Sequence, residues 1–132
     1  EGMPPFEWAA LAGDPLCVPD DGTHSRDFPS VGSVVAALAD AAINHTAIDT
    51  PVNLAFGTRT TLLEVIRLLE GIIGRPLEVR HVEPRAGDVP HSQADQTRFR
   101  ALFPNVRAVP LVDGLATTVE WFRSAPAVVH TG

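Results

Sequence analysis

The chain has 132 residues, enough for one domain with a real core, and its 45% apolar and 20% charged residues are ordinary for a soluble globular protein. Its ten cationic residues are all arginines, and against 16 acidic residues they leave a net charge of −6, which argues against nucleic acid or an anionic membrane as partner. The longest apolar run, 34–39, is far too short to span a bilayer, and the lone Cys17 fits a reducing compartment, so we expect a cytoplasmic protein.

The first third of the chain predicts a helix, a short strand, a loop and a second helix. Proline at 4–5 and Gly13 bracket the first helix, and residues 16–18 form a strand between two prolines. A turn-rich loop follows at 20–25. Ser30 can cap the second helix, whose apolar residues are spaced as one helical face: Val31, Val34, Val35, Leu38 and Ala42.

The remaining elements alternate in the same way. Residues 52–56 predict a strand, and Thr61 with Glu64 forms a capping box at the start of the clearest helix, which Gly74 ends. A strand at 77–82, a loop at 84–92, a short helix capped by Asp95 and a last helix from Asp113 complete the chain.

These elements predict an α/β fold, more closely a small α+β-like layer with about five helices and few, short strands. We expect one domain over 1–125 and a frayed tail over 126–132.

The sequence lacks the motifs of several common kinds of catalytic and metal sites. The chain has no glycine-rich phosphate loop, no Gly-x-Ser-x-Gly elbow and no Cys/His set at zinc spacing. Its five histidines are scattered, and no nucleophile–base spacing supports a hydrolase built from His and Asp. We therefore predict no catalytic, metal-binding or cofactor-binding residue in this chain.

Two arginine loops, 22–28 and 84–89, are the best candidates for a binding site. Arg26 follows a glycine-led turn, and Asp27 could fix either its guanidinium or the loop backbone. In the second loop Arg85 and Asp88 flank Gly87, a pairing that suits a phosphoribosyl group because the guanidinium takes phosphate oxygens and the carboxylate accepts from hydroxyls. We interpret the loops as two halves of one anion site; the alternative is two ordinary surface loops with self-satisfied Arg/Asp pairs.

A series of motifs adds to this interpretation. In chain order they are Gly22-Thr23-x-x-Arg26-Asp27-Phe28, Asn53-x-Ala55-x-Gly57-x-x-x-Thr61-Leu62-Leu63-Glu64, Gly74-Arg75-Pro76-Leu77, Pro84-Arg85-Ala86-Gly87-Asp88-Val89, Ala94-Asp95 and Gly114-Leu115-x-x-Thr118-Val119-x-Trp121-Phe122. Together they resemble the C-terminal half of an NAD-dependent nucleotide-sugar epimerase or dehydratase, an extended member of the short-chain dehydrogenase/reductase superfamily. The resemblance runs from Phe6 to about Arg123.

The resemblance implies a substrate site. It places Arg26 on the nucleotide diphosphate, Arg85 and Asp88 on phosphate and ribose, and the strand of Leu16 and Val18 along the base. The chain departs from the family pattern at Pro19-Asp20, where an aromatic residue and glycine are usual, and at 29–33, where an aromatic and two aspartates are usual.

The resemblance also implies parts that this chain lacks. The family binds NAD on a Rossmann glycine-rich loop and uses a Tyr/Lys pair, whereas this sequence has no tyrosine and no lysine. The chain is then the substrate-binding part for a UDP- or dTDP-sugar, inactive alone and binding no NAD itself. We expect apolar strand faces that are exposed in the isolated chain and that the upstream Rossmann half or a homo-oligomer partner covers. The alternative is a non-catalytic binding or assembly module with the same fold.

Overall fold

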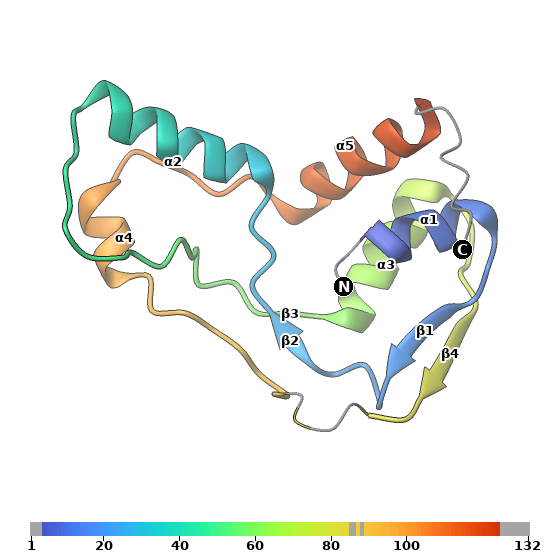
Figure 1. Cartoon of the computed structure of the whole chain (residues 1–132). Coiled ribbons are helices and arrows are strands. Elements are labelled where there is room, and N and C mark those ends of the chain that lie inside the picture. Colours follow the sequence, from blue (N-terminus) through green and yellow to red (C-terminus); the bar gives the residue numbers. More distant parts are fainter. Residues whose placement is uncertain (1–3, 85–86, 88, 125–132) are drawn as a thin grey trace, which may run out of the picture.

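Five helices and four short strands make up the described part of the chain, an α/β fold as predicted (Figure 1). The computed structural model describes residues 4–84, 87 and 89–124. Its elements are α1 (Pro4–Ala12), β1 (Leu16–Pro19), β2 (Ser25–Arg26), α2 (Val31–Ile43), β3 (Thr60–Thr61), α3 (Leu62–Ile73), β4 (Val79–Val82), α4 (Thr97–Leu102) and α5 (Leu111–Ser124). Within this part of the chain no helix is long and apolar enough to cross a membrane.

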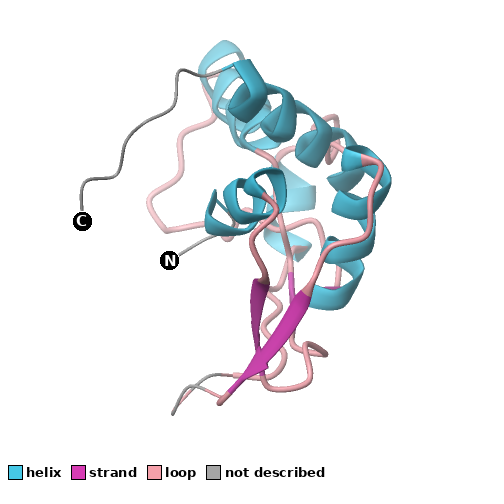
Figure 2. Ribbon diagram, turned by 90° about the vertical axis from the view of Figure 1, so that its right-hand side faces the viewer, coloured by secondary structure: helices cyan, strands magenta, loops and turns pink. Residues whose placement is uncertain are grey.

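The larger lobe packs three helices beside a parallel strand pair. β1 pairs with β4 in the register Leu16↔Val79, and α1, α3 and α5 gather on one side of this pair (Figures 1 and 2). Two clusters of buried side chains form the core between these elements: Ala10, Leu16, Val18 and Ile66, and then Val65, Leu69, Leu115 and Val119. The helix after Thr61 supplies members of both clusters, Ile66 to the first and Val65 and Leu69 to the second.

The capping box predicted at the start of α3 is confirmed. The Thr61 hydroxyl accepts from the Glu64 amide at 3.2 Å, and the Glu64 carboxylate accepts from the Thr61 amide at 2.7 Å. At the other end Gly74 adopts φ +82°, a left-handed conformation that glycine permits without steric cost. The local sequence therefore determines both ends of this helix.

The smaller lobe consists of α2 and α4, and here the structure departs from the helical pattern (Figure 1). α2 buries its small residues: Ala37 packs with Phe99 and Phe103, and Ser33 accepts a 2.9 Å hydrogen bond from the Val109 amide. The predicted apolar face lies outward, with Val31 77%, Val35 58% and Leu38 66% exposed. A helix that is apolar all round offers two possible buried faces, and small residues let the aromatic rings approach more closely.

The strand predicted at 52–56 is wrong, because these residues form no strand in the described part of the chain. A strand needs a ladder partner, and here side chains bind the backbone instead: Asp27 accepts from the Phe56 amide, and Gln93 donates to the Gly57 carbonyl. Large apolar side chains are exposed on the α2 face, at Val31, Val35 and Leu38, and also on β4, at Val82.

Candidate functional site

β2 is the centre of the candidate site, because it binds a neighbouring segment on each side. On one side it pairs antiparallel with β3, in the register Ser25↔Thr61 and Arg26↔Thr60. On the other side the Ser25 amide donates to the Pro90 carbonyl at 2.9 Å, and the Ser92 amide donates to the Ser25 carbonyl at 3.2 Å. The first arginine loop therefore lies directly beside the C-terminal flank of the second.

A side-chain hydrogen bond strengthens this junction. Ser25 is 5% exposed, and its Oγ lies 2.8 Å from Nδ1 of His91. The N-terminal flank of the second loop is also fixed, because β4 pairs with β1 and the Asp20 amide donates to the Val82 carbonyl at 2.9 Å. Both ends of the second loop are thus attached to the segment that carries the first.

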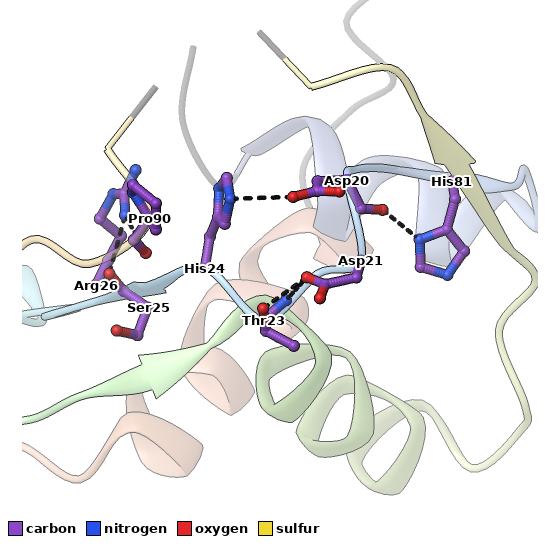
Figure 3. A network of polar contacts seen from close by, with 8 residues as sticks. All are labelled: Asp20, Asp21, Thr23, His24, Ser25, Arg26, His81 and Pro90. Atoms are coloured by element: carbon purple, nitrogen blue, oxygen red, sulfur yellow. Dashed lines mark hydrogen bonds and ion pairs between the residues drawn. The ribbon is translucent and has the colours of Figure 1, made fainter. Parts of the chain in front are cut away.

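The Arg26 guanidinium extends toward the second loop (Figure 3). Its Nη1 donates to the Ser25 carbonyl at 2.9 Å and to the Pro90 carbonyl at 3.3 Å. His24, two residues earlier, projects from the same side of the chain, while the Ser25 hydroxyl lies on the other side (Figure 3). The extended backbone gives this alternation, which places Arg26 and His24 on one face.

The turn before β2 is held by its own polar side chains. Asp20 has φ +54°, an uncommon conformation for a residue other than glycine, and its Oδ2 lies 3.7 Å from Nε2 of His24 (Figure 3). Its carbonyl lies 2.6 Å from Nδ1 of His81 on β4. Hydrogen bonds from the hydroxyl and the amide of Thr23 hold the pKa of the Asp21 carboxyl below its usual value, so Asp21 is a carboxylate at neutral pH.

The position of Gly22 in the structure requires a glycine. Its φ is +76°, and a Cβ there would lie 2.8 Å from Cγ1 of Val18 and 2.9 Å from Cγ of Leu63. The turn is therefore pressed against the core, where only glycine fits. The carbonyl of Gly22 also accepts from the Leu63 amide at 3.3 Å, which joins the turn to the first turn of α3.

Asp27 holds a segment distant in sequence. Its Oδ2 accepts from the Phe56 amide at 2.9 Å, and its Oδ1 accepts from the Thr58 hydroxyl. The Phe56 contact is to backbone, but to the backbone of another segment rather than of the arginine loop, and the Thr58 contact is to a side chain. Asp27 thus joins the arginine loop to residues 56–58.

Two hollows adjoin the loops. One, of about 600 Å³, is open and is lined by Asp20, Asp21, His81, Val82, Glu83 and Pro84 at the ends of β1 and β4. The other, of about 90 Å³, is more enclosed and lies beside Asp27 and Phe28, with walls from Phe56 and residues 108–111. Among the described residues no group of three His, Cys, Asp or Glu side chains could hold a metal ion.

The predicted site residues fall into three groups. Arg26 lies at the junction described above. Arg85 and Asp88 lie outside the described residues, although their flanks are described. Leu16 and Val18 are 1% and 0% exposed and belong to the core, so a base lying along this strand would meet backbone or the exposed Cys17 rather than these two side chains.

Sequence reasoning did not identify the residues that join the two loops, which are Ser25, Pro90, His91 and Ser92. They are ordinary loop residue types, and the pairs that they form lie more than 60 positions apart in the chain. The two-residue length of β2 also gives no periodic signal.

Comparisons with known proteins give a consistent result, although no protein-family model matches. The chain is 34% identical over 119 residues to a UDP-glucose 4-epimerase from Mycolicibacterium smegmatis, covering 90% of this chain and 38% of that protein. It superposes with a TM-score of 0.80 and 32% identity on a UDP-glucose 4-epimerase from Thermotoga maritima solved with UDP-glucose, covering 89% and 38%. It also superposes on MoeE5, solved with UDP-glucuronic acid and NAD, with a TM-score of 0.78, 29% identity and coverage of 92% and 40%.

The proteins with this fold and sequence similarity are NAD-dependent UDP-sugar epimerases and dehydratases. These homologues and structural neighbours are UDP-sugar epimerases and dehydratases of the extended short-chain dehydrogenase/reductase family, and the chain matches only their C-terminal part. It spans about 38% of the length of the M. smegmatis relative.

Proposed function

We propose that this chain is the substrate-binding part of an NAD-dependent nucleotide-sugar epimerase or dehydratase, and that it holds the diphosphate of a UDP- or dTDP-sugar. The observation that supports this proposal most directly is the junction of the two loops at β2, where Arg26 lies beside Pro90. Arginine suits such a site because its planar fork donates parallel hydrogen bonds to phosphate oxygens. A chain of charge −6 must hold an anion by such local contacts.

We place Arg26 on the diphosphate and Arg85 with Asp88 on phosphate and ribose, as the family resemblance implies. The nucleoside would extend from there along β1, over the hollow beside Asp20 and Asp21. The carboxylates of that hollow repel phosphate and accept from sugar or base donors, so they favour this direction of binding over the reverse.

NAD binding and proton transfer would come from the part of the related enzymes that this chain does not span. The sequence offers neither a glycine-rich dinucleotide loop nor a Tyr/Lys pair, so no NAD contact and no proton-transfer step is assigned to its residues. The outward face of α2 fits a protein partner, either the NAD-binding part or a second copy. A non-catalytic assembly module would use this same face.

Calorimetric titration with UDP tests the site. Arg26→Ala and Arg85→Ala should each weaken binding at least about tenfold, because a hydrogen bond to a charged group contributes about 1.5–3 kcal/mol. Arg123→Ala is the matched control, since Arg123 lies near the C-terminal end of α5 with Nη1 3.8 Å from Glu120. Unchanged affinity in both loop variants would refute the site. We expect modest affinity overall, because the family cleft lies between two domains.

A further inference from the structure

The carboxylate of Asp27 is one place where the arginine loop is attached to the segment around Gly57. Its two oxygens accept from two donors, the Phe56 amide at 2.9 Å and the Thr58 hydroxyl. These partners are 29 and 31 residues away in the sequence. The carboxylate therefore acts between two segments rather than within its own turn.

Residues 51–59 have backbone groups that are satisfied by side-chain hydrogen bonds of this kind. They form no strand in the described part of the chain, so the Phe56 amide is satisfied by a side chain and not by a ladder. The Phe56 ring is anchored separately, edge-on to Phe99 at a centroid distance of 5.4 Å. Asp27 thus connects the arginine loop to a segment that is itself fixed on α4.

Arg26 is held by the pairing of β2 with β3, in which it lies opposite Thr60, and on its C-terminal side by Asp27 and Phe28. Phe28 packs against the cluster formed by α3 and α5. A cavity of about 90 Å³ lies beside Asp27 and Phe28, so the loop has room to shift if the carboxylate is removed. Such a shift would change the orientation of the neighbouring Arg26 guanidinium.

We propose that Asp27 is a positioning residue for Arg26: its carboxylate holds the loop against Phe56 and Thr58, and so orients the guanidinium for the diphosphate. The proposal rests on the proposed function for the role of the diphosphate, but the orientation itself concerns this chain alone. It makes Asp27 part of the binding machinery without contact to the ligand.

The test compares Asp27→Ala, Asp27→Asn and Thr58→Val by two measurements on the folded chain. The first is the NMR signal of the Arg26 Nε–H group, assigned by its loss in Arg26→Ala. The second is UDP affinity by titration. Asp27→Ala should shift and broaden the signal and weaken UDP binding about tenfold, because it removes both hydrogen bonds. Asp27→Asn should keep the Arg26 signal close to its wild-type position and UDP affinity within about threefold of wild type, since the amide oxygen can accept from the Phe56 amide while its NH2 group donates to the Thr58 hydroxyl. Thr58→Val should give an intermediate effect.

A double-mutant cycle separates positioning from a general structural role. If Asp27 acts through Arg26, Asp27→Ala has no further effect on UDP affinity in the Arg26→Ala background. An equal loss in both backgrounds overturns the proposal, and so does an unchanged Arg26 signal in Asp27→Ala. If wild type binds no UDP, the proposed function fails and the Arg26 signal alone decides the positioning role. Should Asp27→Ala not fold by circular dichroism, Thr58→Val takes its place, and an unchanged Arg26 signal there overturns the proposal.

Discussion

Glu7 on α1 is a buried carboxyl group whose removal should stabilise the protein. Its side chain is 2% exposed, and its Oε2 has no hydrogen-bond partner among the described residues. Burial raises the pKa of Glu7 above its ordinary value of 4.5, against the opposing effect of a hydrogen bond from its own backbone amide. At neutral pH the fold therefore carries the cost of a desolvated polar group.

Glu7→Met removes that group and keeps a long, flexible side chain. Leaving a buried polar atom unpaired costs about 1–3 kcal/mol, so the free energy of unfolding at pH 7 should rise by roughly that amount. In a chain of this size each kcal/mol corresponds to roughly 3–5 °C in Tm. Urea denaturation followed by circular dichroism measures the difference, and Glu120→Met, at an exposed site on α5, should change stability by less than about 0.5 kcal/mol.

The pH dependence of stability is a second test of whether Glu7→Met stabilises the fold. Because the pKa of Glu7 is higher in the folded state than in the unfolded state, the folded protein takes up the proton more readily. The stability linked to this group is then fully present below pH 4.5 and is lost as pH rises through the folded-state pKa. The gain from Glu7→Met should shrink as pH falls from 7 toward 4.5. A Met variant less stable than wild type at pH 7, or a gain independent of pH, would refute this reasoning.

Two further predictions concern the α2 face and the turn at β2. We expect the concentrated chain to self-associate in light scattering, and Leu38→Glu should abolish this association without loss of stability, since Leu38 is 66% exposed. The control Val112→Glu, at an exposed apolar site on α5, should leave association unchanged, and a monomeric wild type would contradict the prediction. Gly22→Ala should destabilise the fold by at least about 1 kcal/mol in thermal unfolding, because it places a Cβ against Val18 at positive φ. Gly71→Ala, inside α3 with nothing within 4 Å of the added Cβ, should stabilise the fold. Equal effects of the two substitutions would show that the contact with Val18 and the positive φ do not explain the need for glycine at position 22.

Local signals in the sequence predicted the helices well. The capping box at Thr61 and the left-handed Gly74 define α3 by interactions a few residues apart, and the stripe between them is long enough to show a period. The short strands were harder. β1 was predicted from its flanking prolines, but residues 52–56 have the same apolar character and form no strand in the described part of the chain, because pairing depends on a partner and not on the segment itself.

The sequence by itself determined the α/β class, both ends of α3 and the two arginine loops as candidates, because each depends on residues close together in the chain. Only the tertiary structure decided which face of α2 is buried, and that Pro90–Ser92 pairs with Ser25 and Asp27 with Phe56 and Thr58. These pairings are long-range hydrogen bonds between ordinary polar groups, and such groups carry no pattern that identifies their partners. The site is therefore set by which distant segments meet at β2, where the arginine of one loop lies against the backbone of the other.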